Sequence, residues 1–134
     1  MNYQANILEK TEANDFFREV LFTGSRSQLV VMCIQPGEDI GEETHKNVEQ
    51  ILFNLSGTGK VVLNGVESEF KKGDVVVVQP GTTHNFINTG SDKLKIYTIY
   101  APANHIANTI HHTKAEAVAD TKDEEFGNSV KEEE

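Results

Sequence analysis

The sequence has no tryptophan, three prolines and a single cysteine, Cys33. One cysteine cannot form a disulfide within the chain or supply a cysteine-rich zinc site. Cys33 lies in an apolar run, so we expect a buried and unreactive thiol. No run of about 18 apolar residues is present, which predicts no membrane-spanning helix. Because no basic segment followed by an apolar stretch opens the sequence, we expect no secretory signal and a cytoplasmic location.

Basic residues are scarce, with 12 Lys and Arg against 21 Asp and Glu and a net charge of −9. A nucleic-acid-binding protein needs a basic stripe, and a single-strand stacking surface needs more aromatics than seven Phe and three Tyr. We therefore expect no nucleic-acid partner and no membrane partner. The last 21 residues hold eight acids and three lysines, a net −5, which is typical of a solvated helix face with a frayed end.

The 134 residues fit one domain, and their central part is typical of short strands. Runs rich in Val, Leu, Ile, Phe and Tyr alternate with turn signals from Gln28 to Ala101. Asn64-Gly65 favours a hairpin with a two-residue turn. Strands at such short and even spacing predict an all-β sandwich or barrel. The expected strands are 28–35, 50–55, 60–63, 66–70, 75–79, 84–88 and 93–101.

Helical signals lie at the two ends of the chain. Residues 13–21 predict a short helix around Phe16 and Phe17, and residues 114–123 predict a surface helix rich in alanine and charge. Four consecutive valines in 75–79 favour a strand buried on both faces. The predicted organisation is an N-terminal segment 1–27 packing on a barrel 28–101, followed by a tail 102–134 with a surface helix and an acidic end.

Four polar side chains have spacings that fit one site. Glu43 and His45 are two residues apart, so in an extended segment both face the same side. Gln50 comes five residues later and joins them only if residues 46–48 turn or bulge. His84 begins a later strand, directly after a Pro-Gly turn. Two imidazoles, a carboxylate and a carboxamide oxygen form a mixed set that suits Mn²⁺, Fe²⁺, Co²⁺, Ni²⁺ or Zn²⁺.

Two glycine-framed segments resemble the two motifs of the cupin superfamily. The first family motif reads Gly-x5-His-x-His-x3–4-Glu-x6-Gly, and here the segment is Gly37-x5-Glu43-x-His45-x4-Gln50-x6-Gly57. The second family motif reads Gly-x5-Pro-x-Gly-x2-His-x3-Asn, and here it matches at Gly73, Gly81, His84 and Asn88. Fifteen residues, 58–72, separate the two motifs. The segment 36–45 further resembles a subgroup of small single-domain cupins named mannose-6-phosphate isomerase-like.

The resemblance implies a double-stranded β-helix of the jelly-roll type with a short C-terminal helix, usually a homodimer. It also implies one divalent metal ion inside the barrel, held in the family by three histidines and a glutamate. Here Glu43 replaces the first motif histidine, Gln50 replaces the motif glutamate, and Pro80 comes one place late. Because Glu43 adds a carboxylate and Gln50 removes one, the net charge of the ligand set stays near −1. The implied metal ligands are therefore Glu43, His45, Gln50 and His84.

Four protein ligands in an octahedral field leave two positions for water, substrate or dioxygen. The sequence accordingly predicts a metal-dependent enzyme for a small polar or oxygenated molecule, dioxygenase-like or isomerase-like, with Glu43 as general base. The alternative is a non-catalytic module that binds a small, sugar-like ligand. The residues do not separate oxygen chemistry from isomerisation.

Alternatives remain open for several neighbouring residues. Glu49 competes with Gln50 for the ligand position, and the six residues before Gly57 favour Gln50. Phe53 and Phe86 are candidates for lining the site. Tyr97 and Tyr100 are three residues apart, so one regular strand directs a single one of them inward.

Three further histidines, His105, His111 and His112, follow the predicted barrel. In one interpretation they belong to a surface segment that leaves the barrel at Pro102. In the other, residues 101–112 cross the barrel mouth and bring a histidine to the site.

Overall fold

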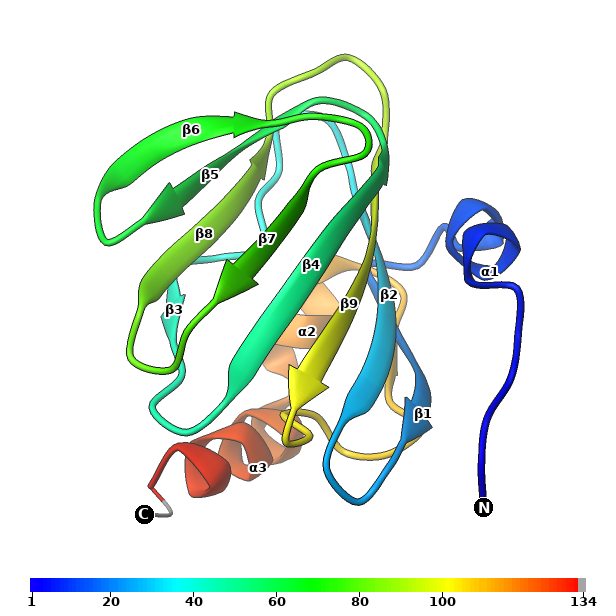
Figure 1. Ribbon diagram of the computed structural model, residues 1–134, viewed down its shortest axis with the longest axis vertical. Coiled ribbons are helices and arrows are strands. Elements are labelled where there is room, and N and C mark those ends of the chain that lie inside the picture. Colours follow the sequence, from blue (N-terminus) through cyan, green and yellow to red (C-terminus); the bar gives the residue numbers. More distant parts are fainter. Residues whose placement is uncertain (133–134) are drawn as a thin grey trace.

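The computed structural model describes residues 1–132, with side chains described to residue 129, and consists mainly of two antiparallel sheets (Figure 1). The six-stranded sheet has the order β10-β1-β2-β9-β4-β7, and the four-stranded sheet has the order β3-β8-β5-β6. The first sheet contains β1 (Arg18–Thr23), β2 (Gln28–Ile34), β4 (Glu49–Ser56), β7 (Val75–Val78), β9 (Leu94–Ala101) and β10 (Ile110–His111). The second contains β3 (Glu43–Thr44), β5 (Gly59–Leu63), β6 (Val66–Phe70) and β8 (Thr83–Asn88). The predicted all-β barrel is confirmed.

The core lies between the two sheets and follows from strand alternation. Along β9 every second residue is buried, and β4 and β8 alternate in the same way. Phe70 and Phe86 meet edge to face in this core, with ring centroids 5.1 Å apart. Cys33 is buried, and burial raises the pKa of its thiol, as expected for an unreactive cysteine.

The hairpin predicted at Asn64-Gly65 joins β5 to β6. Both turn residues have positive φ, 49° for Asn64 and 81° for Gly65, as a two-residue type I′ turn requires. The turn aligns Leu63 opposite Val66.

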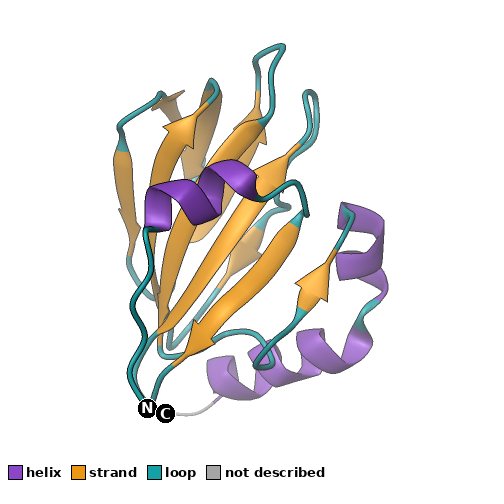
Figure 2. Cartoon of the chain, turned by 90° about the vertical axis from the view of Figure 1, so that its right-hand side faces the viewer, coloured by secondary structure: helices purple, strands orange, loops and turns teal. Residues whose placement is uncertain are grey.

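The helix predicted for residues 13–21 is wrong. A helix occurs earlier, α1 (Ile7–Ala13), which Asn6 caps by accepting a hydrogen bond from Glu9 N–H, and Asn14 then ends it. Residues 18–23 form β1, which pairs with β2 and β10. Val20 is buried on the inner face, so sheet pairing and burial override the weak helical signal. Figure 2 shows α1 crossing the outer face of the six-stranded sheet, and β1 belongs to that sheet although it lies outside 28–101.

The prediction that residues 75–79 are buried on both faces is also wrong. Val75 and Val77 are 52% and 48% exposed, whereas Val78 is buried. β7 is the edge strand of the six-stranded sheet, beside β4, so one of its faces points away from the core.

Two helices follow the barrel where one surface helix was predicted. α2 (Lys114–Ala119) begins at the N-cap Thr113 and ends at Asp120, and α3 (Thr121–Glu132) follows. α3 lies across the lower end of the barrel in Figure 1 and buries Asp123 and Gly127, so it is more than a solvated helix. Residues 133–134 of the predicted acidic end lie outside the described residues. None of the helices described is long and apolar enough to cross a membrane.

Candidate functional site

A small cavity inside one end of the barrel brings the four candidate side chains together. Its volume is about 10 Å³, which is room for about one water molecule or one ion. The residues that line it are Ile40, Gly41, Glu43, His45, Gln50, His84, Asn85, Phe86 and Tyr100. The predicted convergence of Glu43, His45, Gln50 and His84 is therefore present in the fold.

Strand pairing explains why these side chains meet. Glu43 on β3 lies directly opposite His84 on β8, so their side chains share the inner face of the four-stranded sheet. Gln50 belongs to β4 of the other sheet and lies opposite Tyr100. Residues 46–48 bend between β3 and β4, as the odd spacing to Gln50 requires.

His45 is 3% exposed and contacts two of the other candidates. Its Nε2 lies 3.1 Å from Oε2 of Glu43. The ring centroids of His45 and His84 are 5.1 Å apart. Nδ1 of His45 is buried with no hydrogen-bond partner among the described residues. With Nε2 directed at Glu43, Nδ1 is a buried polar atom on the other side of the ring that the rest of the described chain does not satisfy.

The orientation of His84 is set by a backbone carbonyl. Its Nδ1 lies 2.9 Å from the carbonyl oxygen of Thr82. A carbonyl can only accept, so Nδ1 of His84 carries a proton and donates to Thr82. Histidines that bind metals are commonly oriented in this way, by donating their other N–H to a carbonyl.

Gln50 is fixed by Thr98 in a similar manner. The Thr98 hydroxyl donates to the Ile51 carbonyl at 2.8 Å, so it can only accept from Gln50 Nε2, at 3.2 Å. This pairing turns the carboxamide oxygen of Gln50 away from Thr98. Glu49 faces the opposite side of β4 and accepts a hydrogen bond from Gln79 at 3.0 Å. The structure thus places Gln50, and not Glu49, at the cavity.

Within the described part of the chain, no group of three or more His, Cys, Asp or Glu side chains is arranged to hold a metal ion. The candidate set has three such residues, and its fourth donor is the carboxamide of Gln50. The 3.1 Å between Glu43 Oε2 and His45 Nε2 matches the roughly 3.0 Å between two ligands at right angles, each about 2.1 Å from an ion. The types of donor and the size of the cavity suit a divalent ion, but Glu43, His45 and His84 are not arranged around one point in this structure, and the Glu43 side chain is 35% exposed.

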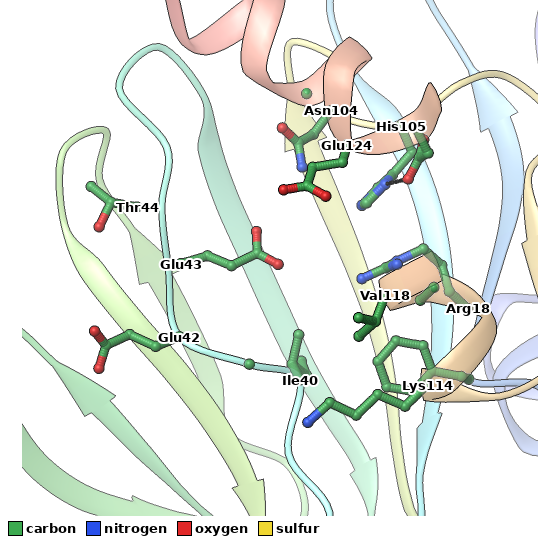
Figure 3. Close-up of a pocket in the computed structure, with 15 residues that line it drawn as sticks. Arg18, Ile40, Glu42, Glu43, Thr44, Asn104, His105, Lys114, Val118 and Glu124 are labelled. Carbon is green, nitrogen blue, oxygen red and sulfur yellow. Dashed lines mark hydrogen bonds and ion pairs between the residues drawn. The ribbon is translucent and has the colours of Figure 1, made fainter. Parts of the chain in front are cut away.

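A second and larger pocket adjoins this cavity (Figure 3). Its volume is about 440 Å³, within the usual range for small-molecule sites. Ile40, Gly41 and Glu43 line both spaces. The remaining walls come from residues at the start of β1, from residues 104–105, and from α2 and α3. Glu43 therefore stands at the boundary between an ion-sized space and a ligand-sized one.

The tail folds back over one end of the barrel, but none of its three histidines lines the small cavity, so the second alternative holds only for the larger pocket, which His105 lines. Gln28 holds it in place by accepting from the N–H groups of Asn104 and His105, at 3.2 and 3.1 Å, and by donating to the His105 carbonyl at 2.7 Å. The His105 ring packs edge to face on Tyr100 and lines the larger pocket. His111 bonds to Arg18 and Asp120, whereas His112 is exposed beside Glu116.

The aromatic candidates divide between the two faces of the sheets. Phe86 and Tyr100 line the small cavity. Phe53 stacks on Tyr97, with ring centroids 4.7 Å apart, on the outer face of the six-stranded sheet. The expectation that Phe53 lines the site is therefore wrong, because Phe53 shares the strand face of Glu49 and not that of Gln50. Burial raises the pKa of the Tyr100 hydroxyl, which stays protonated near neutral pH.

Arg18, Asn104 and Asp123 line the larger pocket, and no motif pointed to them. They come from the N-terminal strand and the tail, outside the two glycine-framed segments. The one available signal was the cluster of histidines after Pro102.

Acid should destabilise the fold through His105. Burial, with the charge of Arg18 beside it, lowers the pKa of His105 to about 4 against the hydrogen bond to Asp123 and the charge of Glu43. Between pH 6.5 and 4 the unfolded chain binds a proton at this position and the folded chain does not, so stability falls as the pH falls. We expect a loss of up to about 3 kcal/mol in the free energy of unfolding across this window.

Urea unfolding at a series of pH values measures this slope. In His105→Gln the slope should flatten, whereas in the exposed control His112→Gln it should stay as in the wild type. An unchanged slope in His105→Gln would assign the acid sensitivity to other groups.

Comparison with known proteins agrees with the fold and with the two glycine-framed segments. Residues 30–100 match the Cupin_2 family model, a cupin domain. The uncharacterized protein YrkC of Bacillus subtilis (strain 168) is 43% identical over 123 residues, which are 87% of this chain and 66% of that protein. The chain thus spans about two thirds of the length of YrkC.

Solved structures extend this similarity. The crystal structure of BH2720 from Bacillus halodurans has a TM-score of 0.87 and 38% identity, covering 89% of this chain and 95% of its own. A protein from Thermotoga maritima, named as a predicted oxalate decarboxylase, has a TM-score of 0.55 and 28% identity, covering 57% of this chain and 66% of its own.

Proposed function

The chain belongs to the cupin family, and on this premise we propose that it is a metal-dependent enzyme for a small polar or oxygenated molecule. One observation carries the proposal: Glu43, His45, Gln50 and His84 converge on a cavity of about 10 Å³ that adjoins a pocket of about 440 Å³. Nitrogen and oxygen donors around an ion-sized space, with a ligand-sized space beside it, suit metal-assisted chemistry.

In this proposal His45 and His84 hold a divalent ion through ring nitrogens, and Glu43 and Gln50 hold it through oxygens. Such an ion supplies a Lewis acid and lowers the pKa of bound water. Glu43 faces both spaces, so once its carboxylate leaves the ion it can take a proton from a molecule in the larger pocket. The aromatic rings of Phe86 and Tyr100 limit the access of bulk water to the small cavity.

The proposal also includes the type of reaction. A base at Glu43 suits an isomerase, in line with the resemblance of residues 36–45 to the mannose-6-phosphate isomerase-like subgroup. A dioxygenase-like activity uses the same donors with a redox-active ion. The second candidate, a non-catalytic module for a sugar-like ligand, is favoured by the neutral Gln50, because an amide oxygen holds a cation less firmly than a carboxylate does. We place the protein in the cytoplasm.

Metal content separates the two candidates. The protein is incubated with Mn²⁺, Fe²⁺, Co²⁺, Ni²⁺ or Zn²⁺, freed of excess metal by gel filtration, and its metal is counted by elemental analysis. The enzyme proposal expects about one ion per chain that resists brief exposure to chelator. Ions lost at once to chelator support the binding module, and no bound ion contradicts the metal site.

Changing Gln50 to glutamate should tighten metal binding. Gln50→Glu adds a charged oxygen donor to the cavity, and we expect an affinity for Mn²⁺ at least about tenfold higher, since charge-assisted contacts are about twice as strong as neutral ones. Equilibrium dialysis measures the change. The control Gln4→Glu adds the same charge at an exposed position and should leave the affinity as it is. Equal effects of the two variants would show that net charge, and not ligation, is responsible.

We also propose that the protein is a homodimer. Val75 and Val77 are about half exposed, and they lie opposite Phe53 and Ile51 on the outer face of the six-stranded sheet. An apolar face of this kind favours a second copy of the chain. Light scattering should give twice the mass of the chain for the wild type and the mass of one chain for Val77→Lys. A wild type of single-chain mass contradicts the dimer.

A further inference from the structure

A buried arginine forms part of the wall of the larger pocket. Arg18 is 5% exposed, and its guanidinium carbon lies 5.2 Å from the centroid of the Phe17 ring. None of the ion pairs between described residues includes Arg18. A guanidinium taken out of water without a direct carboxylate partner is costly, so its position in the wall of a pocket points to an anionic ligand.

Arg18 makes side-chain hydrogen bonds with His111 and Tyr100, and its charge acts on Asp123, but part of its donor capacity is unused. Nη1 lies 3.1 Å from Nδ1 of His111, and Nε2 of His111 lies 2.9 Å from the Asp120 carboxylate. The Asp120 carboxylate can only accept, so Nε2 of His111 donates to it and Nδ1 of His111 accepts from Nη1 of Arg18. Nε of Arg18 is buried with no hydrogen-bond partner among the described residues.

Two acceptor atoms in the same wall are likewise unsatisfied. Nδ1 of His105 donates to Asp123 at 2.7 Å, so the lone pair of the neutral ring lies on Nε2. Nε2 of His105 and Oδ1 of Asn104 are both buried and without a partner in the described chain. Figure 3 shows Arg18, Asn104 and His105 on one side of the pocket, facing Glu43.

The carboxylates of the pocket are engaged elsewhere or lie at its rim. Asp123 accepts from His105 and from the Ile106 N–H, and Glu43 contacts His45. Glu42 and Glu124 are exposed. Acids around the opening favour a singly charged anion over a doubly charged phosphate, because like charges repel.

We propose that the larger pocket binds a small hydroxycarboxylate. Its carboxylate lies on Arg18, and one of its hydroxyl groups donates to Nε2 of His105. The assignment rests on the proposed function, since it names the substrate class for the same site. It satisfies, with a single ligand, one buried cationic donor and one buried acceptor.

Three six-carbon probes test this assignment by calorimetry: gluconate, the neutral polyol sorbitol, and hexanoate, which lacks hydroxyls. We expect gluconate to bind at least about tenfold more tightly than either of the others, because each of them lacks one half of the recognition. Arg18→Gln should weaken gluconate binding at least about tenfold and leave sorbitol as it is. The exposed control Arg26→Gln should bind gluconate like the wild type.

A second pair of variants avoids changing a buried residue. Val118 lines the pocket and is 69% exposed, so Val118→Trp should obstruct the pocket and weaken gluconate binding without unfolding the protein. Ala115→Trp places the same side chain at an exposed position of α2 outside the pocket and should have no effect.

Each titration is performed on chelator-treated protein and on Mn²⁺-loaded protein. If neither form of the protein binds gluconate more tightly than sorbitol and hexanoate, the hydroxycarboxylate assignment is wrong. It is also wrong if both Arg18→Gln and Val118→Trp keep the full affinity for gluconate. Metal loading without gluconate binding refutes this inference and leaves the proposed metal site standing. If the protein binds gluconate but takes up no Mn²⁺, the pocket assignment is supported and the proposed metal site is contradicted.

Discussion

Replacing His84 by alanine should lower the affinity for Mn²⁺ by at least about 100-fold, since loss of a supporting contact alone costs 10- to 100-fold at a metal site. The Thr82 carbonyl fixes the ring beside Glu43 and His45. In His84→Ala, a water molecule that fills the space of the lost ring would not be held in the fixed orientation of the ring. Equilibrium dialysis with elemental analysis gives the affinity and the number of ions per chain.

His112→Ala is the matched control for this substitution. His112 is exposed and contacts Glu116 and Phe16 at the surface, so its loss should leave metal binding unchanged. Circular dichroism of both variants checks that the fold is retained. Full metal affinity in His84→Ala, or an equal loss in His112→Ala, would place the metal away from the cavity.

Replacing Gly57 by alanine should destabilise the fold by roughly 3 kcal/mol or more. Gly57 has φ +94°, where a side chain is strained, and a Cβ there would lie 2.6 Å from the Lys93 carbonyl oxygen and 2.9 Å from Leu94 Cα. Both contacts are with backbone, so β9 would have to shift. Denaturant unfolding measures the loss.

Gly73→Ala separates strain from the clash. Gly73 has a similar φ of +90°, and a Cβ there meets nothing within 4 Å. We expect it to cost about 1–2 kcal/mol, the strain of a left-handed residue alone. Equal losses in the two variants would show that the close approach of Gly57 to β9 has no energetic consequence.

The glycines at the turns between strands explain why so much of the fold could be predicted. Gly57 marks the point where the chain passes against β9, and the two-residue turn at Asn64-Gly65 sets a hairpin register. Between such fixed points, period-two alternation assigns Gln50 and His84 to the inner face. These are local properties of the chain; the choice of Gln50 over Glu49 and the grouping of the four candidates also needed the resemblance to the cupin motifs.

The larger pocket could not be predicted, because it depends on contacts between distant segments. Gln28 holds residues 104–105 over the barrel mouth through three hydrogen bonds, and nothing near Gln28 in the sequence indicates this. Arg18 was assigned to a helix, whereas its strand forms by pairing with β2 and β10. Val75 and Val77 are exposed because they lie on the outer face of the six-stranded sheet, and a run of four valines does not show which face is outward.

Anomalous diffraction from crystals soaked with Mn²⁺ tests the central claim most directly. We expect one strong peak in the cavity of about 10 Å³, within roughly 2.0–2.4 Å of ligand atoms of Glu43, His45, Gln50 and His84. Absence of a peak there, or a peak only at surface groups such as His112, would contradict a metal-dependent function for this site.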